Sequence, residues 1–364
     1  MSGFIKTGKA SVVIDGQFGS TGKGLAAAYQ AERAKDVVWD QVICTTNAAP
    51  NAGHTTVLPD GRKFVTFHMP TIGVMREETS IYLNAGAIID MKVLQQEIEE
   101  FKIKPDRIMV HPNAAIITDE DKAYEQQKTS GATAIASTQK GVGRALARKI
   151  MREGVTAKDF TSDFLKMGVA VSAMDLNEAM AMRWSVVIET PQGMGLSLNN
   201  GFHPHCTSRE VSVAQSLSDA GVHPSYLNQT LMTIRTYPIR VGNIVDENGN
   251  TIGYSGGVYP DQQELSWDSF PNVEPERTTV TKRVRRIFTF SEQQYRDSIA
   301  RLRPDIVHVG FCDYFPHRSA LRGLIEKMMK AHIFYSYTPE IVCSFGPCTT
   351  DVVSLEEALE RLPQ

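Results

Sequence analysis

The fold is decided by the stretch Ser11-Val12-Val13-Ile14-Asp15-Gly16-Gln17-Phe18-Gly19-Ser20-Thr21-Gly22-Lys23-Gly24. Its β-branched start predicts a strand, and the alanine-rich residues 25–33 predict a helix directly after the glycines. A strand that turns through glycines into a helix presents free backbone N–H groups and the positive end of the helix dipole, which together favour an anion. Because Lys23 adds a mobile positive charge, the stretch predicts a phosphate-binding loop.

This loop differs from the ordinary P-loop. That pattern requires a glycine, four residues, Gly-Lys and then serine or threonine. Here five residues separate Gly16 from Gly22, and Gly24 stands where the magnesium-binding hydroxyl should be. A tight turn without a ligand is the weaker alternative, because four glycines and a lysine lie within nine positions. We therefore expect a phosphate loop of another kind.

Composition excludes several classes of protein. The 364 residues are 42% hydrophobic, ample for a large core, and the net charge of -3 implies no bulk attraction to nucleic acid or anionic membrane. No apolar run reaches membrane-spanning length, and residues 1–7 lack an apolar signal core. Five scattered cysteines predict reduced thiols, and two of them, Cys343 and Cys348, could be metal ligands only with a second pair that is lacking. We expect a cytoplasmic protein.

The pattern of the remaining chain predicts an α/β protein. We expect further strands at 37–38, 42–44, 64–67, 81–83, 107–110, 185–188, 306–310 and 341–343, and helices at 91–101, 144–153, 174–184 and 319–330. Residues 129–143 are expected to form a loop, and residues 246–250 a hairpin turn. The alternation favours a mostly parallel central sheet with helices on both faces. Since there is no repeat or low-complexity linker, we expect one domain, residues 1–364.

Several glycine-containing loops follow the predicted strands. They lie at 45–56, 189–195 and 344–347, and ligands of α/β sheets gather at such strand ends. Repeated anion-binding loops at one sheet edge favour a nucleotide enzyme that handles more than one phosphate group.

Four side chains near these loops could carry chemistry. His54 could donate to a transferring phosphoryl group, although a lone histidine is more often a surface residue. Arg283 and Arg285 offer forked donors for a carboxylate or a phosphate, or form a solvated charged strand. Asp313 could accept a hydrogen bond from the ring N–H of a base, but a turn-forming or helix-capping aspartate is at least as common.

Seven motifs, in this order, resemble the adenylosuccinate synthetase family. They are Gly16-Gln17-Phe18-Gly19-x-x-Gly22-Lys23-Gly24, Asn51-Ala52-Gly53-His54-Thr55, Ser137-Thr138-x-x-Gly141-x-Gly143, Glu189-x-x-Gln192-Gly193, Thr207-Ser208, Thr279-Val280-Thr281-x-Arg283-x-Arg285-Arg286 and Gly346-Pro347. Each is weak alone, but together they are specific and cover nearly the whole chain. The resemblance implies a central sheet with antiparallel extensions, a magnesium-dependent ligase and a homodimer. The family phosphorylates the purine O6, and the aspartate amine then displaces the phosphate to form a C–N bond at C6.

One position departs from the family. The family's loop has Asp-Glu where this chain has Ser20 and Thr21. The missing aspartate is the family's general base, which takes the N1 proton of IMP and touches magnesium, whereas a serine hydroxyl is a poor base. The smaller, uncharged side chain frees space beside purine positions 1 and 2, where guanine carries an amine. This matches the phage branch, the 2-aminoadenylosuccinate synthetases, which act on dGMP in making 2-aminoadenine for viral DNA. We expect Ser20, with metal and phosphate nearby, to handle the N1 proton.

The resemblance also implies a role for each matching residue. Catalysis would fall to Ser20, Lys23 and His54. The purine nucleotide would be bound by Ser20, Asn51, Ala52, Thr138, Arg152, Gln192, Thr207 and Arg283, with Arg152 reaching the neighbouring subunit. The triphosphate site would comprise Gly19, Thr21, Gly22, Lys23, Gly24, Gly53, His54, Thr55, Arg285, Asp313, Ser344, Phe345 and Gly346. Aspartate would be bound by Thr279, Val280, Thr281, Arg283 and Arg285, and Mg²⁺ by Ser20 and Gly53.

Three alternatives stay open. An ordinary synthetase would act on IMP with GTP and tolerate Ser20. A non-catalytic regulator would bind nucleotides without turnover. A simple P-loop kinase is disfavoured by the glycine spacing. The family's Lys-Leu-Asp, which selects GTP, corresponds here to Phe311-Cys312-Asp313. Since the lysine is absent and the phage branch resembles an ATP user, we expect ATP as the donor.

Overall fold

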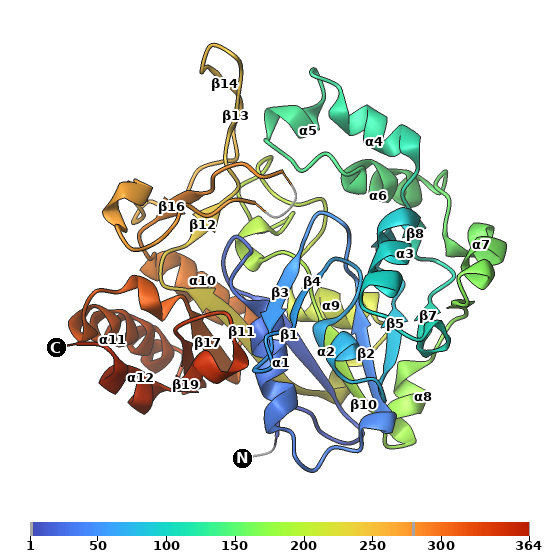
Figure 1. Ribbon diagram of the computed structural model, residues 1–364, viewed down its shortest axis with the longest axis horizontal. Coiled ribbons are helices and arrows are strands. Elements are labelled where there is room, and N and C mark those ends of the chain that lie inside the picture. Colours follow the sequence, from blue (N-terminus) through green and yellow to red (C-terminus); the bar gives the residue numbers. More distant parts are fainter. Residues whose placement is uncertain (1–2, 279–280, 364) are drawn as a thin grey trace.

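A ten-stranded sheet forms the centre of the computed structural model, which describes residues 3–278 and 281–363 (Figure 1). The strand order is β19-β18-β17-β11-β1-β10-β2-β5-β7-β9, and neighbours are parallel except for β18 and β19. The strands are β1 (Ala10–Asp15), β2 (Val42–Thr46), β5 (Ser80–Leu83), β7 (Ile108–Val110), β9 (Ala170–Val171), β10 (Ser185–Glu189), β11 (Leu227–Arg235), β17 (Ile306–Gly310), β18 (Glu340–Ser344) and β19 (Val352–Ser354). The opening stretch thus supplies a central strand.

Helices cover both faces of this sheet. They are α1 (Lys23–Arg33), α2 (Thr71–Met75), α3 (Met91–Glu100), α4 (Asp119–Gln126), α5 (Gly131–Ala134), α6 (Val142–Met151), α7 (Thr161–Lys166), α8 (Leu176–Ala181), α9 (Val213–Asp219), α10 (Glu292–Leu302), α11 (Arg318–Phe334) and α12 (Leu355–Arg361). Strand β1 shows why: Val12 and Ile14 join a cluster with α8 to α12, while Val13 faces Leu25 of α1. Because the strand is buried on both sides, its apolar residues Val12, Val13 and Ile14 are consecutive rather than alternating with polar residues. The predicted fold class is confirmed.

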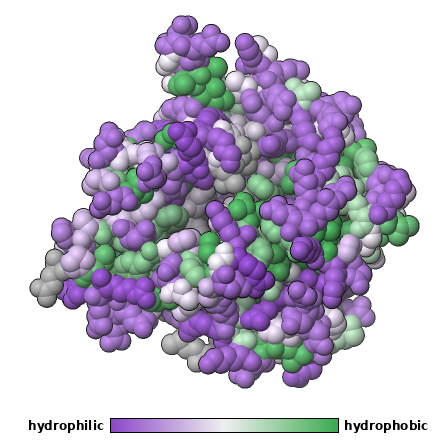
Figure 2. Space-filling model, viewed as in Figure 1, coloured by the Kyte–Doolittle hydropathy of each residue, from purple (hydrophilic) through white to green (hydrophobic). Residues whose placement is uncertain are grey.

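Smaller sheets extend the central one. They pair β3 (His54–Val57) with β4 (Lys63–Thr66), β6 (Ile88–Ile89) with β8 (Ala115–Ile116), β12 (Ile239–Arg240) and β15 (Glu264–Leu265) with β16 (Arg286–Phe288), and β13 (Ile244–Val245) with β14 (Thr251–Gly253). All are antiparallel except β6 with β8. The β13–β14 hairpin projects at the top of Figure 1, with its turn at 246–250 as predicted. In Figure 2 an apolar spot marks this hairpin, where Val245 and Ile252 are exposed, on an otherwise mainly hydrophilic face.

Three local predictions were wrong. Residues 37–38 form no strand, because Val38 is exposed and leads into the short 3-10 turn Trp39–Gln41. The expected loop 129–143 contains helix α5, which Ser130 caps, and the first residues of α6. The helix expected at 174–184 covers only α8, since Asp175 caps its start and Arg183 has a left-handed backbone.

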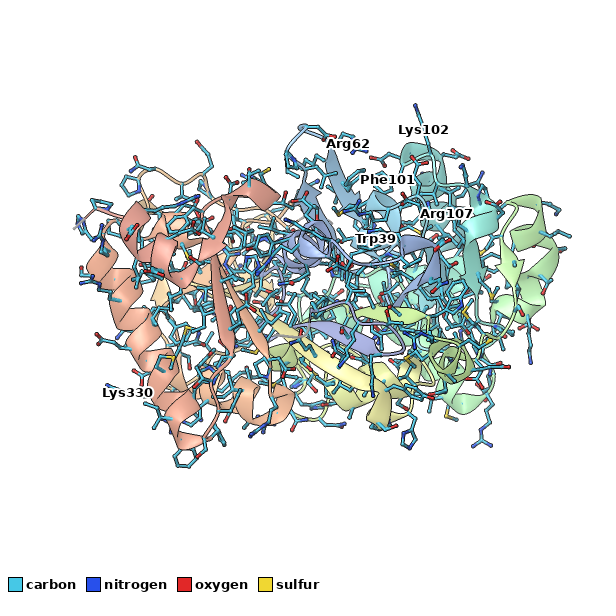
Figure 3. The ribbon with its side chains drawn as sticks, turned by 90° about the horizontal axis from the view of Figure 1, so that it is seen from below. Trp39, Arg62, Phe101, Lys102, Arg107 and Lys330 are labelled. Atoms are coloured by element: carbon cyan, nitrogen blue, oxygen red, sulfur yellow. The ribbon has the colours of Figure 1, made fainter. Side chains whose placement is uncertain are left out.

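Arg107 and Lys330 lie in different parts of the molecule (Figure 3). In Figure 3 Lys330 extends from α11 at one end, far from Trp39, Phe101 and Arg107. Arg107 precedes β7 and donates to the carbonyl oxygens of Gly73 and Thr79, so it ties α2 to the start of β5 and β7. Across residues 3–278 and 281–363, none of the helices combines the length and the apolar character that crossing a membrane requires.

Candidate active site

A cavity of about 850 Å³ opens at the carboxyl-terminal edge of the central sheet. Its walls include the loops after β1, β2, β10, β17 and β18, because parallel strands bring their carboxyl ends to one edge. Helices α4, α5 and α6 close one side, and segments 203–208 and 239–241 close another. Its volume falls within the range of small-molecule binding sites.

Most of the predicted site residues line this cavity. They are Gly19, Ser20, Thr21, Gly22, Lys23, Asn51, Ala52, Gly53, His54, Thr55, Thr138, Gln192, Thr207, Arg285, Asp313, Ser344 and Gly346. Segments far apart in the sequence thus meet at a single composite site. The role assigned to each residue stays a prediction.

Other predicted residues lie elsewhere. Those outside the cavity wall are Gly24, Arg152, Thr281, Arg283 and Phe345. Gly24 lies in the first turn of α1, where a Cβ atom would be 2.6 Å from Oγ1 of Thr56. Arg152 is exposed at the end of α6, with a left-handed backbone (φ 64°). Thr279 and Val280 lie outside the described residues.

The loop after β1 turns sharply into α1. Gly19, Ser20 and Gly22 have φ angles of 92°, 56° and 89°. Glycine adopts this left-handed backbone freely, whereas Ser20 adopts it at a cost, and such strain collects at functional sites. The turn brings the N-terminus of α1 to the cavity at Gly22 and Lys23, as expected for an anion site.

The ammonium of Lys23 is held from two sides. Its Nζ donates to the carbonyl oxygen of Gln192 at 2.8 Å and lies 3.4 Å from Oδ2 of Asp15. Asp15 is the fully buried last residue of β1, and it also accepts a 2.6 Å hydrogen bond from the hydroxyl of Thr21. The lysine is therefore oriented, although its side chain is long and flexible.

His54 forms a pair with a buried carboxylate. Its Nδ1 lies 2.5 Å from Oε1 of Glu189, the last residue of β10. Thr71 also donates to Glu189, from its backbone N–H at 2.7 Å and its hydroxyl at 2.8 Å. Burial alone would raise the pKa of Glu189, but the His54 and Thr71 contacts hold this pKa below its usual value. Nε2 of His54 is buried and has no hydrogen-bond partner among the described residues, so it is available to a ligand.

A charged network surrounds Ser20. Nη1 of Arg285 donates to Oγ of Ser20 at 2.8 Å, and burial lowers the pKa of Arg285 to about 10. Glu276 lies 3.7 Å from Arg285 and accepts hydrogen bonds from Arg235 and from the hydroxyl of Tyr314. Although burial opposes it, the charge of Arg235 and these hydrogen bonds lower the pKa of Glu276. The carboxylate thus stays ionised between two guanidinium groups.

Arg235 joins this network to the far end of the cavity. Its guanidinium lies 3.7 Å from the ring centre of Phe311, and its Nη1 donates to the carbonyl oxygen of Ser20 at 3.3 Å. Burial raises the pKa of the neighbouring Asp313, which also lines the cavity. One arginine therefore contacts both the phosphate loop and the loop after β17.

Arg283 fastens two loops together behind the cavity wall. Its Nη2 donates to the carbonyl oxygens of Ala136 and Ser137, at 2.9 and 3.1 Å, and its Nε donates to the hydroxyl of Thr281 at 3.0 Å. Nη1 of Arg283 and Oγ1 of Thr207 are buried without a partner in the described part of the chain. Unpaired buried polar atoms at a cavity are typical of a ligand site.

The sequence analysis gave no role to four residues of this network. Three of them end strands: Asp15 ends β1, Glu189 ends β10 and Arg235 ends β11. A charged residue that closes an apolar strand was therefore the signal that could have found them. The fourth, Glu276, carries no such signal, because it lies in an irregular segment.

Few protein oxygens are available for a metal ion. No group of three or more His, Cys, Asp or Glu side chains that could hold a metal occurs within residues 3–278 and 281–363. Mg²⁺ is commonly bound by few protein ligands together with substrate phosphates. The Gly53 backbone, at the cavity wall, fits that arrangement, whereas the Ser20 hydroxyl already accepts from Arg285.

Comparison with known proteins identifies the family of this chain. The family model of adenylosuccinate synthetase matches residues 12–171 and 159–300. The chain is 34% identical to N6-succino-2-amino-2'-deoxyadenylate synthase of Salmonella phage PMBT28 over 360 residues, 92% of this chain and 96% of the relative.

Two solved structures share the fold. Cyanophage S-2L succinoaminodeoxyadenylate synthetase, bound to dGMP and to dATP as an energy donor, has a TM-score of 0.81 at 33% identity and covers 97% of this chain and 99% of its own. Adenylosuccinate synthetase from Plasmodium falciparum has a TM-score of 0.72 at 18% identity, over 94% and 99%. The second likeness concerns the fold alone.

Proposed function

This chain belongs to the adenylosuccinate synthetase family, and from this premise we propose that it joins L-aspartate to C6 of dGMP while ATP is cleaved to ADP and phosphate. The product would be 2-amino-2'-deoxyadenylosuccinate, a precursor of 2-aminoadenine in DNA. The phage relatives are N6-succino-2-amino-2'-deoxyadenylate synthases, and the cyanophage structure contains dGMP, which supports this substrate over IMP.

The reaction would proceed in two steps. First, the purine loses its N1 proton and O6 attacks the γ-phosphorus, which gives a 6-phosphoryl purine and ADP. The aspartate amine then attacks C6, and O6 leaves with inorganic phosphate. Lys23 and His54 would bind the transferring phosphoryl group, because both lie at the cavity wall and both are held by carboxylates.

The observation that carries the proposal is the environment of Ser20. Its hydroxyl lies at the cavity wall with Arg285 as hydrogen-bond donor, and residue 20 offers no carboxylate. A hydroxyl oxygen can accept a second hydrogen bond from the 2-amino group of guanine. The positive charge of Arg285 favours the negative charge that develops on the purine as the N1 proton passes to a phosphate oxygen.

The remaining predicted residues would divide between the substrates. Asn51, Ala52, Thr138, Gln192 and Thr207 would bind dGMP from one side of the cavity. Asp313 would accept from the exocyclic amine of the ATP adenine. Thr281, Arg283 and Arg285 would bind the aspartate carboxylates.

Mg²⁺ would neutralise charge on the triphosphate when bound. The Gly53 backbone would hold it on the protein side, and phosphate oxygens would supply other ligands.

We also propose a homodimer. Arg152 lies exposed and outside the cavity of its own chain, which agrees with a role at the nucleotide of a neighbouring subunit. Such a dimer would act in the cytoplasm of the host cell of a phage.

Product analysis tests the proposed function. The enzyme is incubated with aspartate, ATP and Mg²⁺ together with dGMP or IMP, and the succino-nucleotide is identified by mass while phosphate is measured. Turnover of dGMP with little turnover of IMP supports the proposal. A strong preference for IMP and GTP would identify an ordinary synthetase, and nucleotide binding without aspartate-dependent phosphate release would identify a regulator.

A further inference from the structure

A buried carboxylate lies directly beneath the phosphate loop. Asp15 has no exposed surface and does not line the cavity. Its Oδ1 accepts from the backbone N–H of Gln17 at 2.6 Å, and its Oδ2 accepts from the hydroxyl of Thr21 at 2.6 Å. Nζ of Lys23 approaches the same Oδ2 at 3.4 Å. A single side chain therefore contacts the beginning, the middle and the end of the loop.

The contacts of Thr21 fix the direction of these hydrogen bonds. A carboxylate only accepts, so the single hydroxyl hydrogen of Thr21 points at Asp15. The hydroxyl of Thr233 on β11 lies 2.6 Å from Oγ1 of Thr21 and must then be the donor in that contact. The loop is thereby linked through Asp15 to the neighbouring strand.

Gly193 leaves the space that the Asp15 carboxylate occupies. A Cβ atom on Gly193, in the loop after β10, would lie 2.4 Å from Oδ1 of Asp15. Gly193 follows Gln192, whose carbonyl oxygen is the second anchor of Lys23. Asp15 therefore packs against the same loop that shares the lysine with it.

We propose that Asp15 is a positioning residue for phosphoryl transfer. It holds the Lys23 ammonium and the Thr21 turn in the geometry that the reaction needs, without touching a substrate itself. This inference rests on the proposed function for its chemistry, but its geometry does not depend on which purine is bound. Without this partner, the flexible Lys23 side chain would no longer hold its ammonium in one orientation.

The substitution Asp15→Asn tests the proposal, because it keeps the shape and removes the negative charge. We expect kcat to fall by about tenfold or more, with KM for the purine nucleotide changed by less than about threefold. Asp90→Asn is the matched control. Asp90 is also a buried carboxylate, but it pairs with Lys122 at 2.7 Å and caps α3 rather than contacting the phosphate loop. The control should lose stability and keep kcat within about twofold of the wild type.

A rescue experiment separates positioning from general loss of structure. Because Thr21 Oγ1 already contacts Asp15 Oδ2, a carboxylate at residue 21 would reach the same place. Thr21→Glu alone should lower kcat, since two carboxylates would then meet, whereas Asp15→Asn with Thr21→Glu should recover much of it. If Asp15→Asn does not fold, two other variants test the proposal. Thr21→Val should lower kcat, and the double variant should have a kcat closer to that of the wild type.

Two results would overturn the proposal. One is a folded Asp15→Asn enzyme with wild-type kcat. The other is a double variant that recovers none of the lost kcat, or a Thr21→Val enzyme with wild-type kcat. The measurements use whichever purine monophosphate the wild type consumes, and calorimetric binding of ADP with Mg²⁺ is followed in parallel. A failure of dGMP turnover in the wild type would refute the proposed function and leave the comparison of variants intact.

Discussion

Nη1 of Arg285 donates a hydrogen bond to Oγ of Ser20, with 2.8 Å between the two atoms. The two residues are 265 positions apart in sequence, so this contact joins the loop after β1 to the segment before β16. Glu276 lies 3.7 Å behind the arginine and balances part of its charge. Ser20 is thus a neutral hydrogen-bond acceptor beside the guanidinium group of Arg285. Our substrate proposal rests on this pair.

We expect Ser20→Asp to reduce kcat/KM for dGMP by about tenfold or more. A carboxylate there would pair with Arg285, neutralise it and crowd the 2-amino group of guanine. Ser20→Ala is the matched variant, and it should mainly weaken dGMP binding because it removes the acceptor without adding charge. Steady-state kinetics with dGMP measure both effects, and an unchanged dGMP rate in Ser20→Asp would contradict our account of this position.

His54→Ala should lower turnover far more than nucleotide affinity. Nδ1 of His54 is paired with Glu189, and Nε2 would donate to the transferring phosphoryl group. Loss of such a donor costs about 2.7–4 kcal/mol of transition-state stabilisation, or roughly a hundredfold to a thousandfold in kcat. Glu189→Gln should lower kcat less, because His54 is still present and only the contact that orients its ring is weakened. Near-normal turnover in His54→Ala, measured beside calorimetric nucleotide binding, would remove its assigned role.

The proposed dimer can be tested by mixing subunits. If Arg152 completes the neighbouring site, Arg152→Ala and His54→Ala are each nearly inactive, yet a mixed dimer contains one intact site. After subunit exchange an equal mixture should recover about a quarter of the wild-type rate. Light scattering should give the mass of a dimer. A mixture no more active than the sum of its parts would show that Arg152 does not act across an interface.

Stability should fall in mild acid, partly through His308. This residue is buried in β17, with Nε2 2.9 Å from the hydroxyl of Ser344, and burial lowers its pKa from 6.5 to about 4. Between these values the unfolded chain binds a proton that the folded chain does not, so the free energy of unfolding decreases as pH falls. From pH 7 to pH 5 this single group contributes a loss of about 2 kcal/mol.

Urea unfolding of the wild type and of His308→Gln at the two pH values measures this contribution. The variant is less stable at pH 7 but should lose less stability on acidification. Equal losses in the two proteins would show that His308 does not titrate as its burial implies.

The sequence predicted the strands and loops that a local pattern specifies. It did not predict features that depend on residues far away in the chain. The apolar run at 10–15 and the glycines after it specify a buried strand and its loop, and both lie where we expected them. Residues 37–38 have the same β-branched chemistry, but without a covering layer Val38 is exposed and no strand forms. A pair of apolar residues is therefore too short to predict a strand.

The candidate site shows the same difference between local and distant information. His54, Lys23 and Arg285 stand in motifs and line one cavity, while their roles stay predictions. The carboxylates that hold them could not be assigned from spacing. Glu189 reaches His54 across 135 residues, and a contact of that kind depends on strand order rather than on sequence pattern.

A crystal structure of the enzyme with dGMP, aspartate and a non-hydrolysable ATP analogue tests the central claim most directly. Our account predicts that the 2-amino nitrogen of the bound guanine lies within about 3.2 Å of Oγ of Ser20, with Arg285 still donating to the same oxygen. A guanine bound with its 2-amino group turned away from Ser20 would contradict the substrate assignment.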